Sequence, residues 1–266
     1  MLKSLTFNIL SQRYLEPRDF FLEWSWRRGR ILEMLNEFDC DIICLQDVEL
    51  KDIKEDWSSL KSYSHHSHSS NNSKRKNPVG NITFWKHNLF ILIHTEETVY
   101  AIYILLNHLK SSNYILICNL QLVGDSLKHK TSQLKTILRK VVDIREKYSI
   151  NSIYICGNFK FDLLENDIVL LSSPRISKDS NTTMMDELSA LNKSLNHWTS
   201  YSNLRYRSDN WILSNQPFEN DIIFDQLFLE TSEPCEVARF PNYVHPSNNL
   251  PIVFYIETKT KKIKLK

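Results

Sequence analysis

The chain has 266 residues and a net charge of +2, so it is long enough for one large α/β domain. That charge is too small to indicate a nucleic-acid partner by itself. The five cysteines have no C-x-x-C spacing, which argues against a disulfide framework and predicts a reducing compartment. We find no signal-peptide pattern and no apolar run of about 18 residues, so we expect an intracellular protein, cytoplasmic or nuclear, without a membrane span.

The first third of the chain predicts two strands separated by a helix. Residues 2–10 read as a strand, and residues 24–38 read as an amphipathic helix because their apolar side chains recur at helical spacing. Residues 41–45 form a continuous apolar run, which is typical of a strand buried on both faces. Residues 61–77 are rich in Ser, His, Asn and Lys without periodicity, and they predict an exposed loop without regular structure.

The middle of the chain predicts a run of strands followed by a long helix. The helix covers residues 126–147, whose apolar positions fall on one face. A short buried strand follows at 153–156. The strands that precede the helix are expected at 81–85, 90–94, 99–106 and 114–123.

The last part of the chain predicts a helical, loop-rich stretch at 162–195 and strands at 222–229 and 251–258. This element order favours two packed sheets flanked by helices over a doubly wound parallel sheet. We therefore expect a single domain over residues 1–258. The basic tail at 259–266 is expected to be a solvated run.

Several short motifs occur in a fixed order. A strand ending in Asn8 is followed by Leu-Ser-Gln-Arg-Tyr at 10–14, and Trp24 then opens the first predicted helix. Residues 41–49 read Asp-Ile-Ile-Cys-Leu-Gln-Asp-Val-Glu, and residues 80–86 read Gly-Asn-Ile-Thr-Phe-Trp-Lys. Together these motifs resemble the endonuclease/exonuclease/phosphatase superfamily. The match is to its deadenylase branch, which contains the carbon-catabolite-repression deadenylases, nocturnin and the angel proteins.

The resemblance implies a four-layer α/β/β/α sandwich and a Mg²⁺-assisted hydrolysis of phosphodiesters. Such a reaction needs hard oxygen ligands for the metal and a group that activates water. The resemblance places metal ligands at Asn8, which is retained, and at Asp47, where the family has Glu. The shorter side chain changes the reach by about 1.5 Å, a large part of the tolerance of a catalytic site. Asp225 is retained from the pair that supports the family's terminal His.

The other positions implied by the resemblance are altered. The family segments Asn-Thr-His-Leu, Gly-Asp-Phe-Asn and Ser-Asp-His-Leu-Pro read here as Asn-Leu-Gln-Leu, Gly-Asn-Phe-Lys and Ser-Asn-Asn-Leu-Pro. The residues that flank the changed positions still match the family segments, which argues against random drift. The degenerate catalytic positions are Gln121, Asn158, Lys160, Asn248 and Asn249.

These changes remove the acid–base groups and part of the negative charge. An amide cannot accept a proton at neutral pH, so neither Asn158 nor Asn249 can act as general base. With fewer carboxylates and an added ammonium at Lys160, the site should bind Mg²⁺ weakly or not at all. We also consider that Lys160 takes the place of the metal and pairs with Asp47 or Asp225.

Other candidate sites are weaker. His65, His66 and His68 lie in the polar tract, where an incidental surface cluster is the better interpretation than a transition-metal site. Trp24 lies at helical spacing beside apolar residues, which predicts a core anchor rather than a base-stacking side chain. His245 lies four positions before Asn249, where the resemblance places the terminal His, and is a poor candidate for a displaced catalytic His.

We therefore expect a catalytically degenerate, deadenylase-like protein that acts as an RNA- or protein-binding module in RNA metabolism. No cofactor is expected in that case. The alternative is a slow 3′–5′ exoribonuclease acting on poly(A), with Mg²⁺ or Mn²⁺ as cofactor and Asn8, Asp47 and Asp225 at its site. A third hypothesis keeps the fold and assigns another phosphoester, such as a nucleotide or a phospholipid headgroup.

Overall fold

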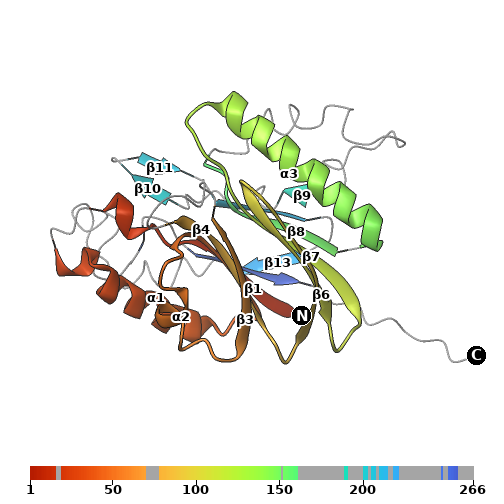
Figure 1. Ribbon diagram of the computed structural model, residues 1–266, viewed down its shortest axis with the longest axis horizontal. Coiled ribbons are helices and arrows are strands. Elements are labelled where there is room, and N and C mark those ends of the chain that lie inside the picture. Colours follow the sequence, from red (N-terminus) through yellow and green to blue (C-terminus); the bar gives the residue numbers. More distant parts are fainter. Residues whose placement is uncertain are drawn as a thin grey trace, which may run out of the picture.

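Two six-stranded sheets pack face to face and are covered by helices on their outer sides, as Figure 1 shows. This architecture confirms the expected four-layer α/β/β/α sandwich. The structure is a computed structural model. It describes residues 1–15, 19–69, 78–150, 152–160, 189–190, 200–202, 205–207, 210–214, 218–221, 247 and 251–256.

The first sheet contains the first and the last described strands of the chain, which pair with each other antiparallel. β1 and β2 run parallel, while β4 and β3 continue the sheet antiparallel to their neighbours. The strand order is β13 (Phe218–Asp221), β14 (Ile252–Ile256), β1 (Leu2–Asn8), β2 (Ile42–Glu49), β4 (Val79–Lys86) and β3 (Tyr63–Ser69).

The second sheet contains the other parallel pair, β7 and β8, whose register sets Gln121 beside Asn158. Its strand order is β5 (Phe90–Thr98), β6 (Ala101–His108), β7 (Asn113–Gln121), β8 (Ser152–Asn158), β12 (Asn210–Ser214) and β9 (Ser189–Ala190). A separate two-stranded ribbon joins β10 (Ser200–Ser202) to β11 (Arg205–Arg207).

Each outer sheet face is buried by one long helix. α1 (Trp24–Phe38) packs Ile31 and Leu35 on the first sheet, and α3 (Leu127–Tyr148) packs Leu134 and Leu138 on the second. The inner faces of the two sheets form a third apolar core. The short helices η1 (Gln12–Tyr14), η2 (Phe20–Leu22) and α2 (Ile53–Asp56) lie in connections. Of the helices in the described ranges, none combines the length and apolar character needed to cross a membrane.

The expected helices at 24–38 and 126–147 are confirmed within one residue. The expected strands at the start of the chain and before α3 are confirmed as β1, β2, β4, β5, β6 and β7, with shifted ends. The expected strand at 222–229 lies outside the described residues, as does 162–195 except for β9.

The expected loop at 61–77 is wrong for residues 63–69, which form strand β3. Ser and His are poor predictors of a strand, but β3 pairs with β4 along its whole length. Gly80 permits this approach, because a Cβ on it would lie 1.9 Å from the carbonyl oxygen of His68. Tertiary pairing therefore determines this strand, and residues 70–77 lie outside the described part of the chain.

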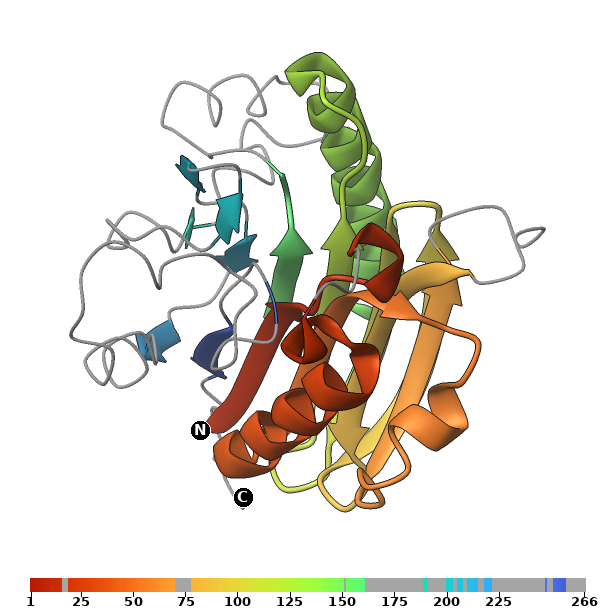
Figure 2. The same cartoon turned by 90° about the vertical axis from the view of Figure 1, so that its left-hand side faces the viewer.

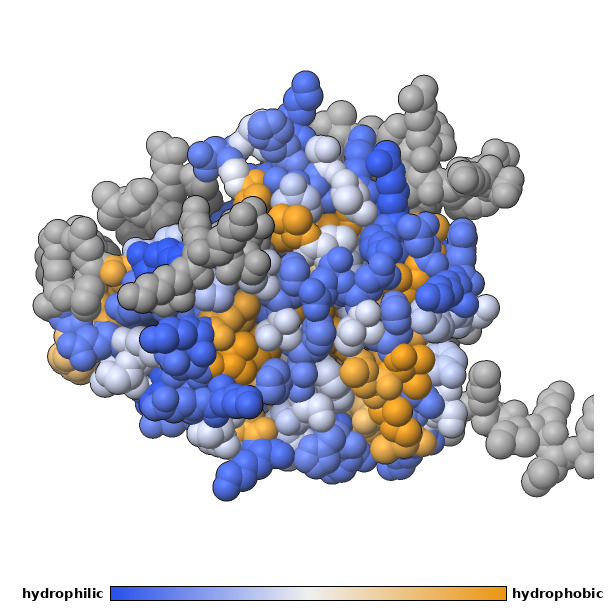
Figure 3. All heavy atoms as spheres, viewed as in Figure 1, coloured by the Kyte–Doolittle hydropathy of each residue, from blue (hydrophilic) through white to orange (hydrophobic). Residues whose placement is uncertain are grey.

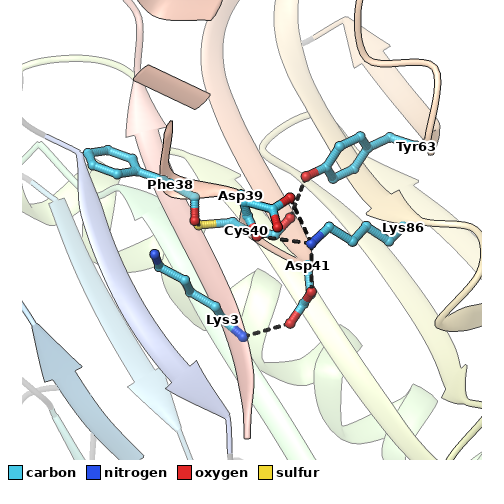
Figure 4. Close-up of polar contacts among 7 residues, drawn as sticks. All are labelled: Lys3, Phe38, Asp39, Cys40, Asp41, Tyr63 and Lys86. Carbon is cyan, nitrogen blue, oxygen red and sulfur yellow. Dashed lines mark hydrogen bonds and ion pairs between the residues drawn. The ribbon is translucent and has the colours of Figure 1, made fainter. Parts of the chain in front are cut away.

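The connection between α1 and β2 is fixed by charged side chains at the end of the sheet shown in Figure 4. Asp39 ends α1 in the left-handed conformation with a φ of 44°. The ammonium of Lys86 lies 2.9 Å from the Asp39 carboxylate and 3.0 Å from the Asp41 carboxylate. Asp41 also accepts a bond of 2.9 Å from the backbone N–H of Lys3. Because of these bonds, the pKa of Lys86 is raised despite its partial burial.

Tyr63 in the same cluster predicts a stability loss at high pH. Its hydroxyl donates a 2.6 Å bond to the carbonyl of Cys40, and burial raises the pKa of Tyr63 from 10.0 to about 12. The unfolded phenol ionises first, so the contribution of Tyr63 is complete below about pH 10 and is lost as the pH rises through about 12. We expect Tyr63→Phe to flatten the decline of unfolding free energy across this interval, measured by urea denaturation. An unchanged slope would contradict this assignment.

Candidate functional site

Four polar side chains lie where parallel strands of the two sheets end. Asn8 ends β1, Gln121 ends β7 and Asn158 ends β8, while Asp47 lies near the end of β2. The carboxyl ends of parallel strands meet at one edge of a sheet, which is where open α/β sheets place their ligands. In Figure 2, β1, β7 and β8 point towards the same end of the molecule.

Asp47 is the centre of this group. The β2–β4 register shifts between Leu45 and Val48, and Asp47 has a left-handed φ of 58°. Its Oδ2 accepts a 2.8 Å bond from Asn8 Nδ2, and its Oδ1 accepts a bond from Gln121 Nε2. Asn8, Asp47 and Gln121 are all buried. The site is therefore a buried carboxylate whose two oxygens each accept an amide N–H, one from each sheet.

The position of Asn8 is fixed by the loop that follows it. Its Oδ1 accepts a 3.0 Å bond from the N–H of Leu10, and its carbonyl accepts a 2.7 Å bond from Ser247 Oγ. The guanidinium of Arg27, fully buried on α1, donates to the carbonyls of Ile9 and Leu10. Burial lowers the pKa of Arg27 to about 10, while the charge of nearby Glu49 opposes that shift. α1 thus holds the loop against the end of β1.

A second polar contact joins the sheets beneath the site. Gln46 Nε2 donates to Asn119 Oδ1 at 2.8 Å and to Thr6 Oγ1 at 3.1 Å. Asn119 Nδ2 donates in turn to the carbonyl of Ile82 at 3.0 Å and to Thr83 Oγ1 at 3.1 Å. Gln46 and Asn119 are fully buried. The sequence pattern alone indicates no role for these two residues, although both lie in the motif segments that contain Asp47 and Gln121.

The end of β8 has a specific backbone shape. Gly157 has a φ of 133°, and a Cβ on it would lie 2.0 Å from the carbonyl oxygen of Leu120. Asn158 Oδ1 accepts a 3.0 Å bond from the N–H of Lys160, which itself has a left-handed φ of 56°. Lys130 on α3 donates a 2.7 Å bond to the carbonyl of Lys160. The turn that follows β8 is therefore held by amide and lysine side chains.

Of the two partners considered for Lys160, Asp47 is not paired with it in the structure, and Asp225 lies outside the described residues. Within the described ranges, Lys160 forms no ion pair, and both oxygens of Asp47 accept amide hydrogen bonds instead. Amide donors satisfy the buried carboxylate without a second charge. Asp225, Asn248 and Asn249 lie outside the described residues, so their roles stay predictions.

The residues at this site do not fit a divalent metal ion as they are arranged. The only carboxylate among the described residues of the group is Asp47, and its oxygens face N–H groups. Asn8 Oδ1 faces the backbone N–H of Leu10, which leaves Gln121 Oε1 as a buried oxygen without a hydrogen-bond partner. Mg²⁺ requires several oxygen ligands in octahedral geometry. In the described ranges, no three His, Cys, Asp or Glu side chains converge in a way that could hold a metal.

The histidines of the polar tract lie at the surface, as expected, but on a strand and not in a loop, which corrects that part of the sequence interpretation. They lie on strand β3. His66 Nε2 lies 2.5 Å from Glu97 Oε1, and His68 Nδ1 lies 2.6 Å from Glu97 Oε2, so β3 is tied to β5 of the other sheet. The ring of His65 contacts that of Phe84 in a tilted arrangement, with centroids 5.5 Å apart, and burial lowers the pKa of His65.

Comparisons with known proteins support the fold and the family resemblance. No family model matches the sequence. The exoribonuclease subunit Ccr4 of the CCR4-Not complex from Kluyveromyces lactis is 22% identical over 95% of this chain and 40% of its own length. Ccr4 of Candida albicans is 25% identical over 58% of this chain and 26% of its own length. Carbon catabolite repressor protein 4 homolog 6 of Arabidopsis thaliana is 27% identical over 54% of this chain and 22% of its own length.

Solved structures give the same fold. The human Nocturnin catalytic domain with bound sulfate superposes with a TM-score of 0.70 at 19% identity, covering 95% of this chain and 92% of that one. The 2′,3′-cyclic phosphatase ANGEL2, in complex with adenosine-2′,3′-vanadate, gives 0.72 at 17% identity, covering 95% and 94%. These matches support the resemblance to the deadenylase branch of the endonuclease/exonuclease/phosphatase superfamily. The chain spans 40% or less of the length of the three curated proteins above.

Truncating the central carboxylate tests its structural role. Asp47→Ala leaves the buried N–H groups of Asn8 and Gln121 without their acceptor, which we expect to lower the unfolding free energy by about 2–3 kcal/mol. Asp47→Asn should lose less, because Asn tolerates the left-handed conformation and retains one acceptor oxygen. Urea denaturation measures both variants. Equal stability of Asp47→Ala and the wild type would contradict this role.

Proposed function

We propose that this chain is a deadenylase-like protein that does not hydrolyse phosphodiesters and acts as a binding module in RNA metabolism. The observation that carries the proposal is the state of Asp47, whose two carboxylate oxygens accept amide N–H groups from Asn8 and Gln121. A metal-dependent site would leave those oxygens free to coordinate a cation.

The acid–base chemistry of the site supports the same conclusion. Gln121 and Asn158 occupy positions where the resemblance implies His and Asp, and a neutral amide neither accepts nor releases a proton near pH 7. Phosphodiester hydrolysis requires an oriented and activated water molecule. The described residues therefore supply neither the His nor the Asp that the resemblance implies for orienting and activating this water.

The charges around the site also disfavour a divalent cation. Lys160 follows Asn158 by two residues, and the ammonium of Lys130 bonds to the carbonyl of Lys160. Two cationic residues thus lie at the end of β8, whereas the described site contributes the single carboxylate of Asp47. Like charges nearby raise the cost of bringing in a metal ion. We accordingly propose that the protein works without a resident metal.

The alternative is a slow Mg²⁺- or Mn²⁺-dependent 3′–5′ exoribonuclease. It is favoured by the similarity to Ccr4 over 95% of the chain and by the contact between Asn8 and Asp47, which lie at the two implied metal-ligand positions. In this case Asp225 would complete the site. Under either hypothesis we propose an intracellular protein with RNA or a protein as its partner.

An activity assay separates the two functions. Purified protein is incubated with labelled oligo(A) and Mg²⁺ or Mn²⁺ beside the Asp47→Ala variant, and the products are resolved on a gel. We expect no shortening above the level of the variant. Shortening that disappears in Asp47→Ala would establish the exoribonuclease. RNA retained without shortening supports an RNA-binding module, and no retention points to a protein partner.

Calorimetric titration with Mg²⁺ gives an independent test of the metal-free site. We expect no saturable heat in the millimolar range, because the oxygens of Asp47 already accept two hydrogen bonds. The Asp47→Asn variant is the matched control, since it removes the carboxylate charge at the same position. Millimolar or tighter binding that is lost in this variant would refute the proposal.

A further inference from the structure

The first four turns of α3 concentrate positive charge. Between Leu127 and Val142 the helix carries five Lys or Arg residues and neither Asp nor Glu. The whole chain is nearly balanced, with 33 basic and 31 acidic residues. The basic residues on this helix are therefore a local feature, and the overall composition does not account for them.

These charges oppose the stability of the helix itself. The N-terminus of a helix carries a partial positive charge, so acidic side chains stabilise its first turn and basic ones destabilise it. α3 has no acidic residue in its first turn, where Lys128 and Lys130 lie, and its N-cap residue Ser126 makes no side-chain capping bond. Basic residues in the first turn thus contradict the usual preference of a helix N-terminus for acidic ones. Sequence features that contradict such local preferences are expected at functional positions.

Three of the basic residues share one face of the helix and are open to a ligand. Lys128, Lys135 and Arg139 are spaced by seven and four residues, which places them on one side of α3. Lys128 and Arg139 are exposed and Lys135 is half-buried. Among the described residues, none of the three forms an ion pair, whereas Lys140 on the neighbouring face is paired with Glu96. Side chains along α3 are mostly hydrophilic in Figure 3.

This face begins at the same end of the molecule as the degenerate site. α3 starts after the end of β7, where Gln121 lies, and Figure 2 shows the helix beginning at the end to which β7 and β8 point. The contact between Lys130 and the carbonyl of Lys160 joins the first turns of α3 to the turn after β8. Positive charge therefore extends from the degenerate site along the outside of the helix.

We propose that Lys128, Lys135 and Arg139 form a track on α3 that binds the phosphate backbone of a single RNA strand without a metal ion. This inference rests on the proposed function, in which the chain binds RNA without cleaving it. The track extends about 16 Å along the helix at about 1.5 Å per residue, enough for several phosphates. Its spaced cations, with no apolar centre between them, suit a polyanion better than a protein surface.

The test uses labelled oligo(A) in EDTA, with binding followed by fluorescence anisotropy at several salt concentrations. The variant Lys128→Glu/Arg139→Glu is compared with Lys61→Glu/Lys110→Glu, which changes the net charge equally at two exposed lysines elsewhere. We expect the α3 variant to bind at least about tenfold more weakly and the control to stay within about twofold of wild type. The salt slope of the α3 variant should fall by about 1.4, since each lost phosphate contact contributes about 0.7.

Thermal melting separates binding from folding. Lys128→Glu places an acidic residue in the first turn, so the α3 variant should melt at the same or a higher temperature than wild type. Wild-type affinity in the α3 variant, equal loss in both variants, or absent binding by the wild type would each overturn the inference. Binding of anionic lipid vesicles in place of RNA would also overturn it. Shortening of oligo(A) with Mg²⁺ would refute the proposed function alone, because the EDTA measurement does not depend on cleavage.

Discussion

The buried carboxylate of Asp47 imposes the main constraint on this structure. An ionised carboxylate removed from water is stable only when donors satisfy its oxygens. Here the donors come from both sheets, because Asn8 ends β1 and Gln121 ends β7. These two hydrogen bonds offset the cost of removing the carboxylate from water, and they also join the two sheets where their parallel strands end. The same two bonds occupy the atoms that a metal-dependent phosphodiesterase would use for its cation.

Close packing and buried hydrogen bonds fix the backbone geometry around the site. Gly157 lies so close to Leu120 that no side chain fits, and buried Arg27 holds the carbonyls that follow Asn8. The contact between Gln46 and Asn119 crosses from one sheet to the other below the site. These features support the scaffold, and their removal would leave buried polar groups unpaired. These contacts hold the backbone around Asn8 and Asn158 in place.

The turn that follows β8 lies in a basic part of the described structure. Lys160 and Lys130 meet at the end of β8, and positive charge continues along the exposed face of α3. Relatives that use a metal ion supply positive charge to a phosphate through that ion. Under the proposed function the cations belong to the protein itself, so attraction of a phosphate backbone and its hydrolysis would be separable properties.

The sequence by itself determined the long helices, most of the strands and the sandwich. Hydrophobic periodicity indicates which face of each element is buried, and the order of the motifs indicates the fold. It also identified Asn8, Asp47 and Gln121 as one group. Only the tertiary structure decided how they bond, since the direction of an amide depends on partners far away in the chain. The same reason explains β3, whose Ser and His residues form a strand only through pairing with β4 and the contact with Glu97.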